Sequence, residues 1–429
     1  MAAAAYFLSL LLLLGSTLYV AAVLLIIGIT SDYFSLGILS NMAGGIAWTT
    51  MTSYILVAVP LFVLLGEILM RSGVADRMYQ SLALWLGWLP GGLIHANIAS
   101  SALFAASSGS SVATAATIGT VAQPTLMRLG YDKRLVLGSI AAGGTLGILI
   151  PPSINMIIYG SLTGTSIGKL FAAGVVPGVM LAIMMSIAAI VVSVVQAKKA
   201  KTVEQVVRMS DRIRALVHII PVLLVFAVVM GSIYLGIATP TEAASLGVVA
   251  AVGIAFFNGR LSVEMLHQAF LSSIRTTAMI LLVVVASFIL NFQLSVTGVP
   301  QAMADWISHL NLGPYQTIWI IVIFYLILGC FLDAVAMLVT TIAVVFPLVI
   351  ALGFDPVWFG IFMTLMMELA LITPPIGLNL FVVQNIRIDS GTISDVYIGV
   401  LPFVAAMIVF VGVLIYFPGI ALWLPSILF

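Results

Sequence analysis

The chain has 429 residues, of which 63% are hydrophobic and 7% are charged, and its formal net charge is +1. Soluble domains are about 45–50% apolar and about 25% charged, so this composition excludes a soluble, disordered or nucleic-acid-binding protein. The single cysteine, Cys330, excludes a disulfide within the chain and a cysteine-built zinc site. We therefore predict a protein that crosses a membrane many times.

Stretches without Asp, Glu, Lys or Arg predict the membrane helices, since about 20 apolar residues are enough for one crossing. Residues 1–5 lack the positive charge of a secretory signal, so the first apolar stretch is expected to be a retained helix. Single helices are expected near residues 6–28, 52–70, 170–197, 213–236, 241–257, 276–296 and 396–417. The period-two alternation of an outer-membrane barrel is absent, so the predicted fold is all-α and polytopic.

The polar segment 198–214 separates two halves of the chain. It carries six of the fifteen Lys and Arg residues, so the positive-inside rule predicts that it is cytoplasmic. We expect a first repeat over 1–197, this loop with a connecting helix over 198–240, and a second repeat over 241–429.

Matching residues in the two halves predict an internal duplication. At a constant offset of 223 residues the halves share the pairs Thr117/Thr340, Pro124/Pro347, Gly130/Gly353, Asp132/Asp355 and Pro151-Pro152/Pro374-Pro375. Isolated Val or Leu identities are common in such a biased composition. Tandem prolines and a Gly-x-Asp turn at fixed spacing are much harder to obtain by chance.

The two repeats should have opposite topology, because their Gly-x-Asp turns differ in charge. Arg128, Lys133 and Arg134 flank the first turn, whereas residues 351–358 around the second contain no basic residue. The first turn is then cytoplasmic and the second external. Counting the expected membrane crossings from these two turns predicts a cytoplasmic N-terminus and an external C-terminus.

Each repeat is expected to contain a re-entrant hairpin followed by a helix that is broken at its proline pair. The hairpins are predicted over 93–129 and 315–352, and the broken helices over 135–163 and 356–386. Proline lacks a backbone N–H group, so each pair leaves carbonyls of the preceding turn without partners. Non-helical backbone at membrane depth is tolerated only where it is buried or lines a cavity. These elements therefore predict a binding site.

Small polar residues gather at the expected tip of the first hairpin, namely Ser107, Ser108, Gly109, Ser110, Ser111 and Thr114. Hydroxyl and carbonyl oxygens are hard, neutral ligands that suit a weakly bound alkali cation, and helix N-termini beside them suit an anionic substrate. The alternative interpretation is that these small residues only allow close helix packing.

The second repeat adds two carboxylates. Asp333 stands where the first repeat has Ser110, and Glu368 stands opposite Thr145. Ionisable groups inside a membrane are costly and mark ion pathways or interior partners. Asp333 could instead only cap the second helix of its hairpin, and Glu368 could be a structural hydrogen-bond acceptor.

Three motifs resemble the large membrane subunit of tripartite ATP-independent periplasmic (TRAP) transporters: SSGSSVATAATIG at 107–119, GTLGILIPPS at 144–153 and ELALITPPIGLN at 368–379. The resemblance extends over nearly the whole chain. It implies an elevator-type secondary transporter of the bacterial inner membrane, whose mobile domain contains both hairpins and both broken helices. The C-terminus would then be periplasmic.

The resemblance also implies ligands and partners. Sodium is expected as the coupling ion, with two or more sites, and the substrate as an organic acid such as a dicarboxylate, a keto acid or sialic acid. A small four-helix membrane subunit and a periplasmic substrate-binding protein are the expected partners. In part of the family an acidic residue stands at the place of Thr114, so the hydroxyl here removes a charge from the first site.

The residues of the predicted sites follow from these motifs and their matching positions. The predicted cation ligands are Ser107, Ser110, Thr114, Gly144, Thr145, Pro151, Gly329, Asp333, Glu368, Thr373 and Pro374. The predicted substrate-binding residues are Ser108, Gly109, Ser110, Ser111, Ser153, Asn155 and Asn379.

Motifs for other functions are missing from the sequence. It contains no Gly-x-x-x-x-Gly-Lys-Ser/Thr motif, so ATP hydrolysis by this chain is not expected. No His/Cys/Asp cluster indicates an intramembrane enzyme. A stand-alone sodium/anion symporter of related architecture remains an alternative, and so does a channel, which would need a continuous polar pore.

Overall fold

The computed structural model describes residues 9, 12–13, 18–35, 37–195, 208–302 and 312–429. Over these residues the chain is helical and contains no strand. The prediction of an all-α membrane protein with hairpins and broken helices is confirmed. Part of the expected cytoplasmic loop, 198–207, and part of the first expected helix lie outside the described residues.

The two hairpins have closely matched helix boundaries. The first consists of α6 (Leu93–Ser108) and α7 (Ser111–Arg128), and the second of α16 (Pro314–Gly329) and α17 (Ala334–Ala351). The bounds of α7 and α17 differ by the same 223 residues that relate the sequence motifs. The local sequence signals of the two halves therefore start and stop their helices at equivalent positions.

A broken helix follows each hairpin. In the first repeat α8 (Lys133–Leu149) bends by 41° into α9 (Ile154–Thr163), and in the second α18 (Pro356–Ile372) precedes α19 (Leu378–Asn385). Asp132 and Asp355 cap α8 and α18 in the same way, each accepting from two backbone N–H groups of the first turn. The helices end before the proline pairs because proline supplies no N–H to the turn behind it.

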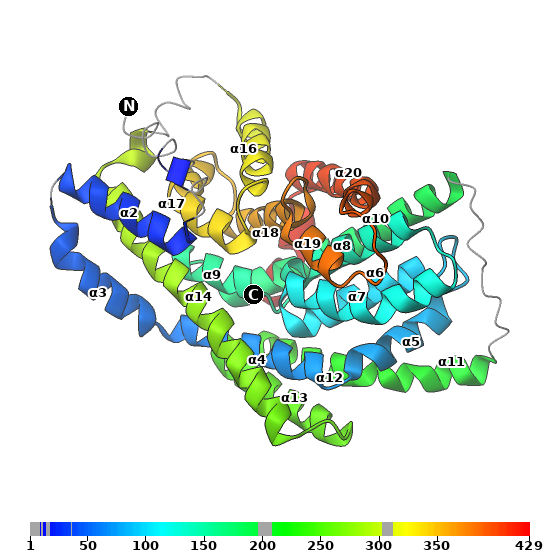
Figure 1. The fold of residues 1–429 in the computed structure, drawn as a ribbon. Coiled ribbons are helices and arrows are strands. Elements are labelled where there is room, and N and C mark those ends of the chain that lie inside the picture. The colour runs from blue at the N-terminus through cyan, green and yellow to red at the C-terminus, as the bar shows by residue number, and fades with distance from the viewer. Residues whose placement is uncertain (1–8, 10–11, 14–17, 36, 196–207, 303–311) are drawn as a thin grey trace.

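Six further helices form a framework beside these elements. Its members are α2 (Val20–Tyr33), α3 (Leu39–Met51), α4 (Ala58–Arg71), α12 (Ile220–Tyr234), α13 (Pro240–Phe257) and α14 (Val263–Val296). They lie along the left and lower side of Figure 1, where α14 crosses α4. We call this group the scaffold.

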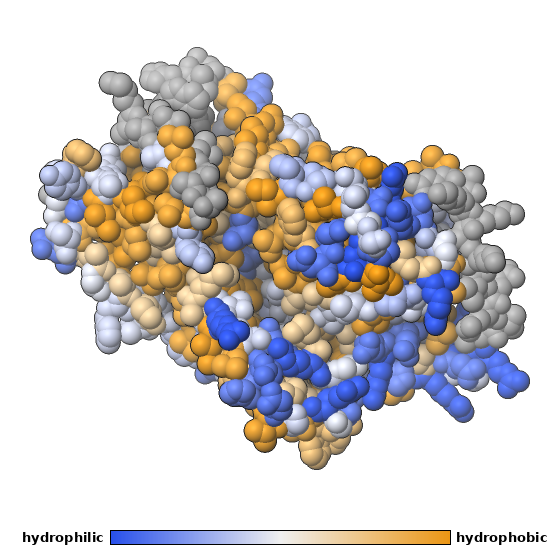
Figure 2. All heavy atoms as spheres, in the orientation of Figure 1, coloured by the Kyte–Doolittle hydropathy of each residue, from blue (hydrophilic) through white to orange (hydrophobic). Residues whose placement is uncertain are grey.

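Two long helices accompany the broken helices. These are α10 (Ile167–Val195), which packs on α8, and α20 (Ser394–Tyr416), which packs on both α8 and α18. By length and hydropathy, six of the described helices can cross a membrane, or eight if two bent pairs each count as one span. Hydrophobic residues dominate the left of the surface, while hydrophilic ones gather at the lower right (Figure 2).

The structure adds helices that charge-free runs did not predict. These are α3, α5 (Val74–Leu86), α11 (Met209–Ala215) and the C-terminal α21 (Gly419–Leu428). The helix expected near 276–296 also begins 13 residues earlier, at Val263. Charges end a membrane crossing but do not end a helix, so α5, α11 and the start of α14, which carry charged residues, were missed or truncated. The uncharged α3 and α21 share charge-free stretches with the expected helices near 52–70 and 396–417, and each stretch was assigned only one helix.

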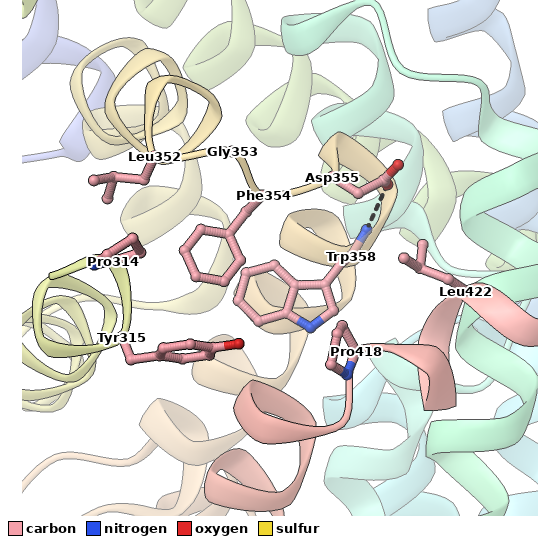
Figure 3. A pocket seen from close by; sticks show the side chains of 9 residues that line it. All are labelled: Pro314, Tyr315, Leu352, Gly353, Phe354, Asp355, Trp358, Pro418 and Leu422. Atoms are coloured by element: carbon pink, nitrogen blue, oxygen red, sulfur yellow. Dashed lines mark hydrogen bonds between the residues drawn. The ribbon is translucent and has the colours of Figure 1, made fainter.

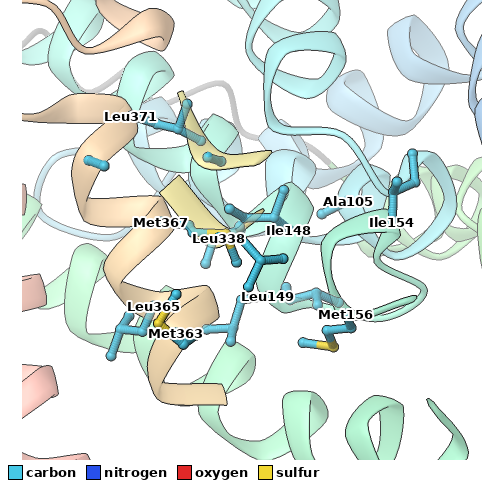
Figure 4. Close-up of a cluster of buried hydrophobic side chains, with 14 of the residues drawn as sticks. Ala105, Ile148, Leu149, Ile154, Met156, Leu338, Met363, Leu365, Met367 and Leu371 are labelled. Atoms are coloured by element: carbon cyan, nitrogen blue, oxygen red, sulfur yellow. The ribbon is translucent and has the colours of Figure 1, made fainter. Parts of the chain in front are cut away.

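The core lies where the two broken helices cross. Leu149 and Met156, on either side of the first break, are fully buried with Met363 and Leu365 of α18. Figure 4 shows these side chains in one apolar cluster, together with Leu338 of the second hairpin. This packing holds elements of both repeats around the breaks.

Candidate functional site

The tip of the first hairpin is a turn between two polar helix ends. Gly109 has φ +62°, a backbone conformation that favours glycine. Ser110 caps α7 by accepting a hydrogen bond from the backbone of Ala113 at 3.4 Å. The hydroxyls of Ser108 and Thr114 lie 3.0 Å apart, and Thr114 donates to the carbonyl of Ser110 at 2.8 Å.

This tip lies against the first break. A Cβ added to Gly109 would lie 2.9 Å from the carbonyl oxygen of Pro152, and one added to Gly147 would lie 2.6 Å from that of Ser110. The hydroxyl of Ser153 is fully buried and has no hydrogen-bonding partner among the described residues. Small residues thus bring hydroxyls and backbone carbonyls of two elements into one place.

The second hairpin repeats this arrangement with a carboxylate. Asp333 occupies the position of Ser110 and caps α17, since its Oδ1 accepts from the backbone of Ala336 at 2.7 Å. The thiol of Cys330 lies 3.6 Å from the carbonyl oxygen of Pro374, and a Cβ added to Gly329 would lie 2.6 Å from the Cβ of Ala370. Each hairpin tip therefore meets the break of its own repeat.

The two halves of the candidate site differ in exposure. Ser107, Ser108, Gly109 and Ser111 are buried, as is every residue of the first break from Ile150 to Asn155. In the second repeat Asp333, Pro375, Ile376 and Leu378 are exposed. In this conformation the first tip–break pair is closed and the second is open.

Glu368 lies on α18 and connects the repeats. Its side chain is 0% exposed, and neither carboxyl oxygen has a hydrogen-bonding partner among the described residues. The carboxyl lies beside the backbone amide of Leu149, in the last turn of α8. An isolated carboxylate at such a place is costly, so the position calls for a bound cation or a proton.

Asn379 makes a second connection between the repeats. This side chain, which follows the second break, is fully buried, and its Nδ2 donates to the carbonyl of Ala141 on α8 at 3.2 Å. Its Oδ1 has no partner within the described part of the chain. The amide therefore keeps a free acceptor beside the junction of the two repeats.

The other predicted hydroxyls are held by their own helices. Ser107 donates to the carbonyl of Phe104 at 2.8 Å, Thr145 to that of Ala142 at 2.8 Å, and Thr373 to that of Leu369 at 2.6 Å. Each hydroxyl oxygen keeps its lone pairs for another partner. Gly144 packs against Ala115, which joins α8 to the second helix of the hairpin.

The set of oxygens fits a weakly held alkali cation. No group of three or more His, Cys, Asp or Glu residues that could hold a metal occurs among the described residues. The donors present are neutral hydroxyls and carbonyls, with the carboxylates of Asp333 at the second tip and Glu368 on α18.

One contact of the site carries no sequence signal. Gly66 of α4 lies so close to the first tip that an added Cβ would be 2.8 Å from the carbonyl oxygen of Ser108. Only packing between the scaffold and the hairpin makes this glycine important.

A separate open pocket lies at the second Gly-x-Asp turn. It has a volume of about 360 Å³ and is lined by aromatic residues such as Tyr315, Phe354 and Trp358, with Asp355 as its charged residue. Figure 3 shows these side chains at the start of α16 and α18. The pocket contains none of the predicted site residues.

Comparison with known proteins identifies the family of this chain. Residues 3–420 match the family model described as "Tripartite ATP-independent periplasmic transporter, DctM component". The chain is 36% identical over 338 residues to the C4-dicarboxylate TRAP transporter large permease protein DctM of Pseudomonas aeruginosa, covering 79% of this chain and 78% of that relative. It is 33% identical over 369 residues to the isethionate TRAP transporter permease protein DctMQ of Oleidesulfovibrio alaskensis, covering 85% of this chain and 57% of that relative.

A solved structure shares the fold. The YdaH transporter of Alcanivorax borkumensis superposes with a TM-score of 0.60 at 11% sequence identity, covering 96% of this chain and 98% of that one. This likeness concerns the fold alone. The family model and the relatives, in contrast, match through sequence over most of the chain, and the chain therefore belongs to the tripartite ATP-independent periplasmic transporter family, as its DctM component.

Proposed function

We propose that this permease is the membrane unit of a sodium-coupled importer of a small organic acid, which a periplasmic binding protein delivers. The observation that carries this proposal is the pairing of each hairpin tip with its own break. Prolines stand where the donors to the carbonyls of Gly147, Ile148 and Leu371 would be, and the carbonyl of Ala370 accepts from the backbone of Thr373 at 3.4 Å instead. Such carbonyls, with hydroxyls beside them, are the ligands that secondary transporters offer to Na⁺.

The first pair would hold a cation through neutral oxygens, and the second through Asp333 in addition. In the first repeat the proposed cation ligands are Ser107, Ser110, Thr114, Gly144, Thr145 and Pro151. In the second repeat they are Gly329, Asp333, Glu368, Thr373 and Pro374. Because Asp333 is exposed and the first tip is buried, the two halves would exchange ions at different stages. Bound sodium would supply positive charge that favours an anionic substrate nearby.

The substrate would bind between the repeats. The residues proposed to contact it are Ser108–Ser111, Ser153, Asn155 and Asn379, of which Ser153 and Asn379 have buried oxygens free to accept a hydrogen bond. An organic acid is favoured because one relative is named for C4-dicarboxylates and another for isethionate, and both are anions.

An elevator movement is proposed between two helix groups that are each hydrogen-bonded internally, with Ser287 of α14 donating across them to the carbonyl of Val339 on α17 at 2.8 Å. In the scaffold, Arg71 of α4 donates to Ser272 of α14 at 3.1 Å. The hairpins and broken helices are joined to one another across the repeats. We propose that they move as one body, with 1–197 and 241–429 as inverted repeats.

The proposed partners are a small four-helix membrane subunit and a binding protein. The DctMQ name of one relative, of which this chain covers 57%, suggests that a further subunit is fused there. Relatives that are permeases point to a transporter rather than an enzyme. A stand-alone symporter or a channel gains no comparable support.

Reconstituted vesicles provide the test of this function. Uptake of the acid that co-purifies with the binding protein should need the small subunit, the binding protein and an inward sodium gradient. Vesicles with a potassium gradient of the same size serve as the control. Uptake that continues without sodium, or that requires ATP, would refute the proposal.

Opposite topology of the repeats can be tested by labelling. We expect Lys133→Cys to react with a membrane-impermeant thiol reagent only from the cytoplasm, and Pro356→Cys only from the periplasm, because only the first turn carries basic residues. Cys330 is first replaced by Ser to remove background labelling. Labelling of both positions from the same side would contradict inverted repeats.

A further inference from the structure

The short helix after the second break needs support from its surroundings. The helix α19 has eight residues, and isolated helices of this length are not stable. At its start, Asn379 donates to the carbonyl of Ala141 on α8. Beyond its end, the side chain of Ile386 packs against Gly119 of α7. The helix therefore rests on elements of the first repeat.

A partly exposed ion network fastens the far end of α19. Arg387 pairs with Asp389 and donates to the carboxylate of Asp395 at 2.9 Å and to the carbonyl of Thr392 at 2.8 Å. The Arg387 side chain is only 1% exposed and that of Asp395 10%, whereas those of Asp389, Lys133 and Arg134 are 41–50% exposed. The Arg387 guanidinium also lowers the pKa of the exposed Asp389 below its usual value.

Asp395 extends this network to the first repeat. Its carboxylate lies 3.0 Å from Lys133 Nζ and 3.1 Å from Arg134 Nε, at the first turn of α8. One turn further along, α8 and α20 touch through their backbones, since a Cβ on Gly399 would lie 2.0 Å from the carbonyl oxygen of Arg134. Asp395 thus joins three cations from both repeats.

The first repeat has a neutral counterpart of this junction. The hydroxyl of Tyr159 on α9 donates to the carbonyl of Pro356 at the start of α18, at 2.6 Å. In both repeats the short helix after the break is therefore fastened to the beginning of the other repeat's broken helix. In the first repeat a hydrogen bond from a hydroxyl to a carbonyl makes this connection, and in the second repeat ion pairs make it.

We infer that Asp395 and Arg387 are positioning residues, which hold α19 on α8 so that the second break keeps a fixed distance from the first repeat. This inference rests on the proposed function, because it treats the breaks as parts of the transport site. Neither residue touches the hairpin tips. Their effect on transport would come from the placement of Thr373–Asn379.

The test compares two substitutions that remove one charge each from the same network. Asp395→Asn removes the carboxylate shared by Lys133, Arg134 and Arg387, whereas Asp389→Asn removes one that is ion-paired with Arg387 and feels Lys133 of α8 only at longer range. Spin labels at Phe381→Cys on α19 and Arg128→Cys at the end of α7, in a Cys330→Ser background, report their separation by pulsed electron paramagnetic resonance. The same variants without labels are measured for uptake in vesicles.

We expect Asp395→Asn to broaden the distance distribution and to raise the substrate concentration for half-maximal uptake several-fold, while Asp389→Asn leaves both near wild type. If Asp395→Asn fails to assemble, Arg387→Lys replaces it, with a smaller change in the same direction. Equal behaviour of the two Asp variants, or broader distances with unchanged uptake, would overturn the inference. Loss of sodium dependence in the wild type would refute only the proposed function, because the distances are measured without sodium or substrate.

Discussion

Asp333→Asn is expected to raise the sodium concentration for half-maximal uptake by roughly one to two orders of magnitude, since about 1.4 kcal/mol corresponds to a factor of ten in binding. The substitution removes a full charge from the open half of the site and keeps nearly the same volume. The carboxylate has two oxygens, and Oδ1 is engaged in capping α17 through Ala336. Asparagine caps a helix about as well as aspartate, so folding should survive while cation binding is weakened.

The measurement is the initial uptake rate against sodium concentration, with thermal stability followed in parallel. Asp355→Asn is a matched control, because Asp355 caps α18 through Val357 and Trp358 but lies at the turn away from both breaks. It should leave the sodium curve unchanged. If the curves of Asp333→Asn and wild type superimpose, Asp333 is a cap and not a ligand.

Gly147→Ala should abolish uptake and lower thermal stability. The added Cβ would lie 2.6 Å from the carbonyl oxygen and 2.7 Å from the carbonyl carbon of Ser110. These are backbone atoms of the first tip, so the hairpin itself would have to move away from the break. Overpacking of this kind typically costs about 1–3 kcal/mol in a folded core.

Gly253→Ala provides the contrast within the same chain. This glycine lies in the interior of α13, and nothing lies within 4 Å of a Cβ added there. Alanine in a helix interior is favoured over glycine by roughly 0.5–1 kcal/mol, so this variant should melt slightly higher and transport normally. If Gly147→Ala took up substrate and melted like the wild type, neither transport nor stability would depend on the close contact between the tip and the break.

The sequence alone determined the helical class, the position of both breaks and the equivalence of the two halves. Proline pairs, capping aspartates and glycine turns determine the backbone conformation of only a few neighbouring residues. The boundaries of α7, α8, α17 and α18 therefore follow from these local signals. They could also be recognised at a constant offset without any knowledge of packing. Searching for charge-free runs found the long apolar helices for the same local reason.

Charge-free runs did not predict the helices, or parts of helices, that contain charged residues. Asp76 and Arg77 lie within α5, and Glu264 and Arg275 within the first part of α14. Backbone hydrogen bonds continue past a charged side chain, because a helix is satisfied in water as well as in lipid. The charges marked the edge of the membrane region and not the end of the helix.

Only the tertiary structure decided how the candidate site is assembled. No pattern in the sequence indicated that the first tip would be buried and the second exposed, or that Gly66 of the scaffold would contact Ser108. The bond from Asn379 to Ala141 spans 238 residues, and that from Arg134 to Asp395 spans 261. Contacts over such separations depend on which helix faces pack together. In a chain that is so uniformly apolar, the helices lack the hydrophobic periodicity that would predict which of their faces is buried.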